Sequence, residues 1–142
     1  FMRSGTSTLV YYENTKKKSI FVSGRTFSVL YRSGDIFNKG FIVMQHVPVT
    51  EDGMKIFEEK VRNELPMFQA QEALIATRLL KQLKSRHYII LTQWRTEDEY
   101  IKWKKSDQHE KFDFSKMARL PAYFAERPFT SSYTMIKEND DE

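Results

Sequence analysis

Two side chains in this 142-residue chain could do chemistry where they stand: Gln45 and Trp103. Gln45 lies within FIVMQHVPV (41–49), which is otherwise apolar nearly throughout. An amide in such a stretch must find hydrogen-bond partners or point into a polar cavity. Trp103 stands in TEDEYIKWKK (96–105), where almost every neighbour is charged. A single indole there is either a core anchor or part of a ligand pocket.

The three histidines are candidates for metal or proton chemistry. His46 follows Gln45 and must face the opposite side of the same strand, so we interpret it as a packing residue or a group that supports the site. His87 begins a strand beside Arg86 and is expected to be exposed. His109 is expected to lie on a short helix after Ser106, where an exposed helical residue is the simplest interpretation.

Six elements follow Gly40 and would position these residues. Residues 41–49, 73–83, 86–95 and 129–137 have the apolar and β-branched character of strands. A helical stretch separates the first two strands, and another precedes the last. The order strand, helix, strand, strand, helix, strand predicts an α+β fold of the ferredoxin-like βαββαβ type, with both helices on one face of an antiparallel sheet.

Capping residues and apolar spacing predict the two helices. The first opens at Thr50, carries apolar residues at helical spacing and is stopped by Pro66. The second opens at Thr96, whose hydroxyl can cap free N–H groups, and it carries Trp103. A further short helix begins at Ser106. The apolar stripe of the first helix comprises Met54, Phe57, Val61 and Leu65.

The N-terminal region contains three more strand patterns, at residues 8–13, 19–24 and 26–34. They have no helices of their own, so we expect them to pair with or close against the second face of the ferredoxin-like sheet. One chain would then imitate a two-subunit α+β barrel, which predicts a monomer, with a homodimer as the alternative. The expected division is a strand extension (1–39), a ferredoxin-like domain (40–137) and an acidic tail (138–142).

Composition excludes several classes of function. Without cysteine the chain has no disulfide framework, thiolate metal site, cysteine nucleophile or iron–sulfur cluster, which suits a reducing cytoplasm. The net charge of +4 is dispersed, and Lys16–Lys18 form its only compact run, so we expect no nucleic-acid partner. No apolar run approaches the roughly 18 residues of a membrane span, and no signal-peptide pattern begins the chain.

The element order, FIVMQHVPVT and YIKWKKSDQHEKF together resemble the antibiotic-biosynthesis-monooxygenase (ABM) superfamily, and within it the Isd-type haem-degrading monooxygenases of the longer Bacillus and Listeria type. The resemblance covers about residues 27–136. It implies that haem is both substrate and cofactor, that O2 and an external electron donor such as a reductase are needed, and that the porphyrin ring is opened to release iron.

The resemblance also implies roles for particular residues. Gln45 falls on the family's pocket asparagine and would donate an amide hydrogen bond, while Trp103 falls on its tryptophan and would press against the ring. The family's histidine ligand falls on Asp113, which cannot act as a neutral imidazole. Either His109, one turn earlier, binds iron, or the ligand comes from elsewhere, or haem is not bound. Phe112 would line the same pocket.

Two further implications concern the pocket mouth and the competing functions. Arg119 and Lys116 are candidates to meet the haem propionates, although solvated surface charge explains them equally well. The alternative to haem degradation is a non-catalytic stress-response or signalling protein like staphylococcal TRAP, which shares the layout but lacks the tryptophan. A third possibility is a monooxygenase acting on a small aromatic metabolite.

Overall fold

A computed structural model describes residues 2–4, 7–9, 11–14, 19–22, 25–36, 39–68, 73–83, 85–105 and 128–135. In chain order the elements are β1 (Met2–Ser4), β2 (Ser7–Leu9), β3 (Tyr11–Asn14), β4 (Ser19–Val22), β5 (Arg25–Ser33), β6 (Phe41–Pro48), α1 (Met54–Phe68), β7 (Leu74–Gln82), β8 (His87–Trp94), α2 (Glu97–Lys104) and β9 (Phe129–Met135). From β6 onward this confirms the predicted βαββαβ order.

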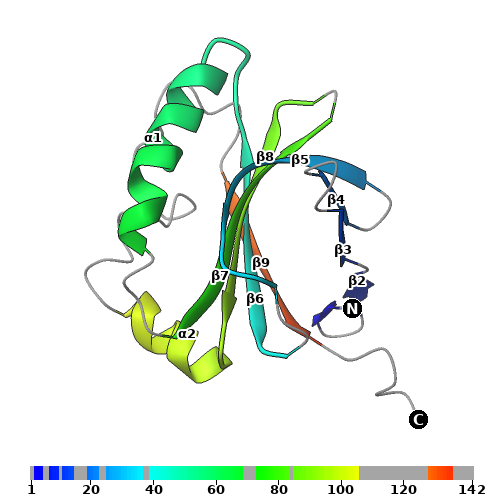
Figure 1. Cartoon of the computed structure of the whole chain (residues 1–142), viewed down its shortest axis with the longest axis vertical. Helices are drawn as coiled ribbons and strands as arrows, with labels where there is room; N and C mark the ends of the chain where they lie inside the picture. The colour runs from blue at the N-terminus through cyan, green and yellow to red at the C-terminus, as the bar shows by residue number, and fades with distance from the viewer. Residues whose placement is uncertain are drawn as a thin grey trace.

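The nine strands of the described residues form one sheet in the order β2-β1-β9-β6-β8-β7-β5-β4-β3. Its centre is the four-stranded antiparallel sheet of the ferredoxin-like half, in which β6 pairs with β8 and β9. Both helices lie on one side of this centre, and β2, β3 and β4 lie on the other (Figure 1). The prediction that the N-terminal strands join the ferredoxin-like sheet is therefore confirmed.

The N-terminal strands extend the sheet from both of its sides. β5 pairs with β7 at one side, while β1 pairs with β9 at the other. The two edge strands, β2 and β3, are separated in the chain by Val10 alone. Because one residue spans only a few ångströms, the two edges of the sheet must lie near each other. The sheet therefore curls toward a barrel within one chain.

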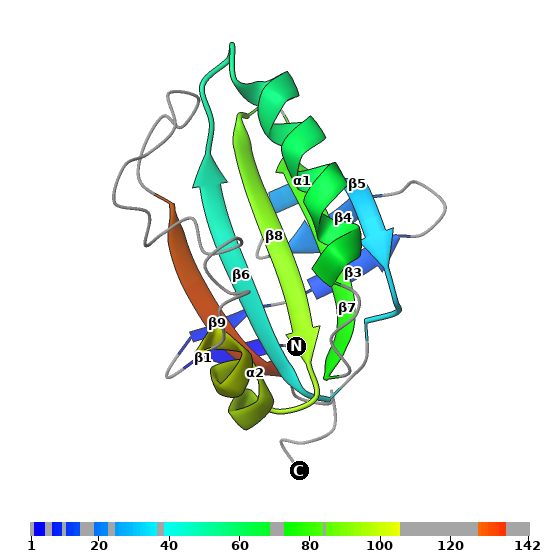
Figure 2. The same cartoon turned by 90° about the vertical axis from the view of Figure 1, so that its left-hand side faces the viewer.

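Alternation along β6 divides its side chains between the two faces of the sheet. Val47 and Val49 pack with Phe57, Val61 and Leu65 of α1. We call this group the α1 cluster, and its sheet members also include Leu79, Tyr88 and Ile90. Figure 2 shows α1 lying across β8 and β7 on this face.

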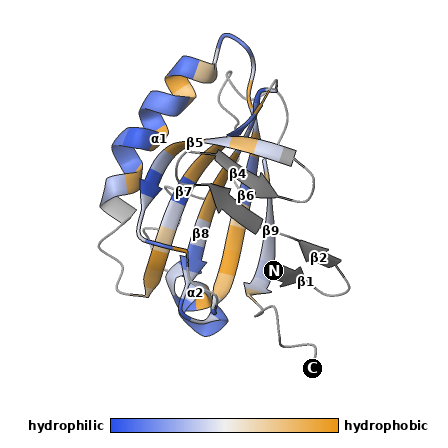
Figure 3. Ribbon diagram, turned by 45° about the vertical axis from the view of Figure 1, so that its right-hand side comes forward, coloured by the Kyte–Doolittle hydropathy of each residue, from blue (hydrophilic) through white to orange (hydrophobic). Residues whose placement is uncertain are grey.

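The same face carries a second group near α2, which we call the α2 cluster: Phe41, Val43, Trp94 and Trp103. On the opposite face, Ile42 and Met44 pack with Phe27 of β5, and Leu80, Ile89 and Leu91 complete this group. The strands of the sheet centre accordingly carry long hydrophobic stretches, whereas the outer side of α1 is hydrophilic (Figure 3). Both faces of the central sheet are therefore covered by the chain itself.

Two details differ from the sequence-based expectation. Pro66 lies inside α1 and does not stop it, since the helix continues to Phe68. Leu65, which is 1% exposed in the α1 cluster, fixes the preceding turn by packing, and this outweighs the local preference of proline. The N-terminal strands also differ: β1 was not predicted, and the single strand expected at residues 8–13 is divided between β2 and β3. The short helix expected from Ser106 lies outside the described residues.

Candidate functional site

Trp103 is held in an aromatic group between α2 and β8. Its ring centroid lies 5.2 Å from that of Trp94 and 6.1 Å from that of Tyr100, and Tyr100 also lies 5.7 Å from Phe41. Only 8% of Trp103 is exposed. The indole is thus a rigid member of the α2 cluster, because two aromatic neighbours, one on β8 and one on α2, restrict its rotation.

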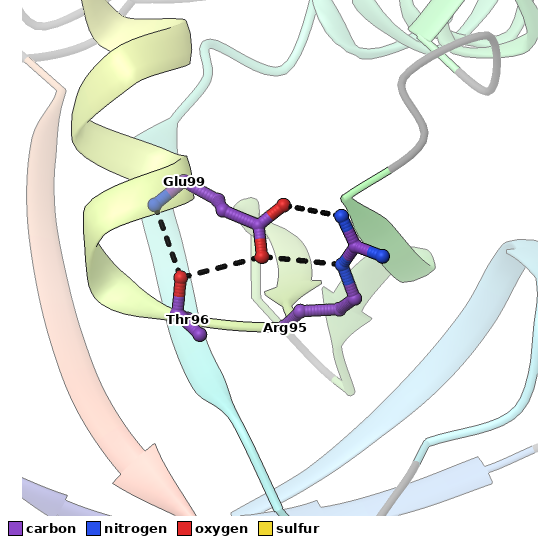
Figure 4. Close-up of polar contacts among 3 residues, drawn as sticks. All are labelled: Arg95, Thr96 and Glu99. Carbon is purple, nitrogen blue, oxygen red and sulfur yellow. Dashed lines mark hydrogen bonds and ion pairs between the residues drawn. The ribbon is translucent and has the colours of Figure 1, made fainter.

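Polar contacts at the start of α2 fix the helix that carries Trp103 (Figure 4). The backbone N–H of Glu99 donates to Thr96 Oγ1 at 3.1 Å, which confirms the predicted N-cap. Arg95 donates through Nε and Nη2 to the two carboxylate oxygens of Glu99, at 3.1 and 2.5 Å. These hydrogen bonds lower the pKa of Glu99, so its carboxylate stays charged at the positive end of the helix.

Gln45 lies on the same sheet face as Trp103. Its neighbours on that face of β6 are Val43, in the α2 cluster, and Val47, in the α1 cluster. Across the sheet it pairs with Ile90 on β8 and Thr130 on β9. The half-buried amide therefore stands at the boundary between the two hydrophobic clusters that the helices cover.

Other hydroxyl groups follow this boundary. Thr77 pairs with Thr92, Thr92 pairs with Val43, and Val43 pairs with Ser132. Because these residues face the same side as Gln45, they extend its polar line across four strands. We call this group the polar band: Thr77, Thr92, Gln45, Ser132 and Thr130.

The members of the polar band differ in how their hydrogen bonds are satisfied. Thr92 Oγ1 accepts from Trp94 Nε1 at 3.0 Å and donates to the carbonyl of Val43 at 3.5 Å, so its hydroxyl is already hydrogen-bonded within the core. Thr77 is fully buried, yet its Oγ1 has no hydrogen-bond partner. A buried hydroxyl without a partner costs free energy, so Thr77 is an unsatisfied polar group inside this face.

The remaining predicted site residues, His109, Phe112, Asp113 and Arg119, lie outside the described residues, as does Lys116. Of the proposed set, Gln45 and Trp103 are the described members, and both lie on the helix-covered side of the sheet. Their assignment to a haem pocket stays a prediction.

The other two histidines form a pair on the opposite face of the sheet. His46 Nδ1 lies 3.2 Å from His87 Nε2, and His46 Nε2 lies 2.9 Å from Ser131 Oγ. Because Gln45 faces the helices, the expectation that His46 faces away from it is confirmed. The expectation that His87 is exposed is wrong: it is half-buried, because the register of β6 and β8 brings the two imidazoles together.

Two parts of the candidate site were not found from the sequence. The polar band joins residues of four strands, and only the strand register shows that they are neighbours. Trp94 was assigned to a strand but not to the surroundings of Trp103. The spacing of Thr92 and Trp94, two apart in a strand, was the available signal that both face the same side.

Three further features of the described residues bear on other sites. A pocket of about 420 Å³ is lined by Glu51, Met54, Lys81, Ser85 and Arg86, at the end of the sheet far from Trp103. Among the described residues, no three His, Cys, Asp or Glu side chains gather as a metal-binding group. In the same part of the chain, no helix is long and apolar enough to cross a membrane.

Comparison with known proteins identifies relatives. Residues 40–113, more than half of the chain, match the family described as antibiotic biosynthesis monooxygenase. A haem-degrading monooxygenase of Listeria monocytogenes is 27% identical over 105 residues, which are 74% of this chain. The matched segment spans 62% of the length of that relative.

Solved structures support the fold. A major regulator of staphylococcal pathogenesis superposes with a TM-score of 0.68 at 23% identity. The match covers 80% of this chain and 69% of the regulator chain. The haem-degrading enzyme of Listeria monocytogenes superposes with a TM-score of 0.61 at 20% identity, covering 89% of this chain and 83% of its own. At these identities, the likeness establishes the ferredoxin-like fold alone.

Proposed function

This chain belongs to the antibiotic biosynthesis monooxygenase family, and from that premise we propose that it is a haem-degrading monooxygenase. The observation that carries the proposal is that Gln45 and Trp103 share the helix-covered face of the sheet, with Gln45 at the boundary between two hydrophobic clusters. The relative from Listeria monocytogenes, at 27% identity, supports haem as the substrate.

The described residues fit such a substrate in their chemistry. Apolar side chains of the α1 and α2 clusters suit the faces of a flat macrocycle, and the polar band supplies amide and hydroxyl groups along one line. Thr77 Oγ1 is buried without a hydrogen-bond partner, and a ligand or a bound water at this face would satisfy it. When bound, haem would supply the iron at which O2 is activated, with electrons from an external donor.

The chain's own residues would position the ring and exclude water. Gln45 would donate an amide N–H toward the iron-facing side of the pocket. Trp103, held by Trp94 and Tyr100, would act as a rigid wall that presses on the ring. Because the packed indole has little rotational freedom, aligning it with the ring costs less conformational entropy than aligning an exposed side chain would.

We further propose that the sequence between α2 and β9 completes the pocket. His109 or another group would bind the iron, Phe112 and Asp113 would line the site, and Arg119 would meet a propionate. This division of roles rests on the family resemblance of those positions.

Titration of the purified chain with haemin tests the proposal. We expect a Soret shift that saturates at one haem per chain, followed by bleaching and iron release when ascorbate or a reductase is added. Trp103→Phe should slow bleaching more than it weakens binding. Lys102→Ala, an exposed neighbour on α2, is the matched control and should leave both unchanged. A chain that gives no Soret shift is not a haem-degrading enzyme.

A non-catalytic regulatory role is the second candidate, favoured by one observation. The superposition on the staphylococcal regulator has a TM-score of 0.68, against 0.61 for the haem-degrading enzyme, although it covers 80% of this chain and not 89%. A regulator would show no Soret shift with haemin, and Gln45 and Trp103 substitutions would then alter stability alone. The same titration therefore separates the two functions.

A further inference from the structure

Three side chains on the sheet face opposite the helices form a polar group that the proposed haem chemistry does not use. His46, His87 and Ser131 come from β6, β8 and β9, near the end of the sheet where β6 finishes and the other two strands begin. Figure 2 shows these three strands side by side, with β6 in the middle. Strand pairing therefore fixes the relative positions of the three side chains.

The geometry points to a transition-metal site. The ring nitrogens that face each other, His46 Nδ1 and His87 Nε2, are 3.2 Å apart. Imidazole nitrogens bind Zn²⁺ at about 2.0–2.1 Å, so two such ligands at a tetrahedral angle lie about 3.3 Å apart. We propose that these two nitrogens bind one divalent ion of the zinc class between them.

The surroundings of His46 suit a metal ligand. In the metal-bound form its Nε2–H donates to Ser131 Oγ, 2.9 Å away, which leaves the lone pair of Nδ1 available to the ion. The Phe129 ring stacks on the His46 ring, with centroids 4.5 Å apart and planes within 5°. The hydrogen bond at the ring edge and the stacking on the ring face together fix the orientation of the His46 imidazole.

The site has coordination positions that the two histidines do not fill. No third His, Cys, Asp or Glu joins the pair within the described residues, so water would complete the coordination. Both imidazoles are only half-buried, and Phe129 is 55% exposed, so an ion can reach them from solvent. A site of this kind is open and exchangeable, unlike a closed structural zinc site.

The same distance also fits a hydrogen bond in which a proton lies between the rings, and the experiment distinguishes the two. Calorimetric titration of the full chain with Zn²⁺ should show one site per chain. His87→Gln should abolish this binding, and Ser131→Ala should weaken it about tenfold by releasing the His46 tautomer. Thr134→Ala, on β9 but on the other face and outside the polar band, is the matched control and should bind as the unmodified chain does.

A second measurement needs no variant and so does not depend on whether the substituted chains fold. In ¹⁵N spectra of the histidine side chains, saturating Zn²⁺ should shift the Nδ1 of one imidazole and the Nε2 of another. The proposal is overturned if a His46→Gln/His87→Gln chain binds Zn²⁺ as tightly as the unmodified chain. It is equally overturned if Zn²⁺ leaves both of those nitrogens unshifted, because the pair would then hold only a proton.

Discussion

The indole rings of Trp94 and Trp103 lie 5.2 Å apart and are tilted by 36°, so that strand β8 and helix α2 meet through two tryptophans. This contact gives Trp103 a structural role whatever its part in chemistry. Substitutions there must therefore be interpreted with stability and activity measured side by side.

Removal of the Trp103 indole should cost considerable stability. Trp103→Ala is expected to lower the free energy of unfolding by about 3–5 kcal/mol, because it leaves a cavity beside Trp94 and Tyr100. Trp103→Phe should cost less, since an aromatic ring remains. Urea denaturation measures both. A Trp103→Ala chain as stable as the unmodified one would show that the α2 cluster does not hold the helix.

Gln45→Leu should remove the amide while keeping the packing of the side chain. Leucine is similar in size and would lie between the same apolar clusters, so the packing should be kept while the polar contacts of the amide are lost. Haemin bleaching should slow, because the amide donor is lost. Gln82→Leu makes the same change on β7 and should leave bleaching unaffected. Equal bleaching rates in all three chains would exclude Gln45 from the reaction.

Tyr88 should make stability sensitive to alkaline pH. Its hydroxyl donates to Glu58 Oε2 at 2.5 Å, and burial followed by this hydrogen bond raises its pKa well above the ordinary value of 10.0. An unfolded chain therefore loses the proton from about pH 10 upward while the folded chain keeps it, and stability falls as pH rises.

The comparison with Tyr88→Phe isolates this effect. At neutral pH the variant should lose about 1–3 kcal/mol, since the hydrogen bond to a carboxylate disappears. Urea midpoints measured from pH 8 to 11 should converge for the two chains as pH rises. Parallel curves would mean that Tyr88 titrates alike in the folded and unfolded chains.

The start of α2 should respond to acid. Arg95, through its hydrogen bonds, lowers the pKa of Glu99 below its ordinary value of 4.5, so Glu99 stabilises the fold above that pH and loses this effect as pH falls. Glu99→Gln should therefore differ from the unmodified chain at pH 7 and approach it in acid. Thermal unfolding from pH 7 to pH 3 provides the measurement.

The cap itself can be tested separately. Thr96→Ala should destabilise the chain by about 1 kcal/mol, whereas Thr96→Ser keeps an oxygen that accepts from the Glu99 N–H. A Thr96→Ser chain as unstable as Thr96→Ala would show that the methyl group, and not the hydroxyl, matters here.

The full chain should be a monomer in solution. Phe27 of β5 is 2% exposed and packs on Ile42 and Leu80, so the sheet face opposite the helices is covered internally. Light scattering coupled to size exclusion measures the mass. A stable dimer at low concentration would show that this covering does not replace a second subunit.

Local signals predicted much of the ferredoxin-like half. The apolar run around Gln45 specified β6, and Thr96 with its following carboxylates specified the start of α2. The Pro66 prediction failed because the rule that proline ends a helix takes no account of packing, although Leu65 beside it was correctly placed in the apolar stripe. The boundary expected between residues 39 and 40 stays a prediction, although the matched family begins there.

The relationships across the sheet were not predictable in the same way. His46 and His87 are 41 residues apart, and their contact depends on the exact register of β6 and β8. A shift of one residue would turn one imidazole to the other face. Thr77 likewise becomes a candidate only once its burial without a partner is known.

The pairing of β1 with β9 joins Arg3 to Thr134. During synthesis the first of these residues leaves the ribosome long before the second, so this pairing must wait until the last strand has emerged. Contacts between such distant segments slow folding. The N-terminal strands would meanwhile expose unpaired backbone, which makes early dependence on chaperones an expected cost of this topology.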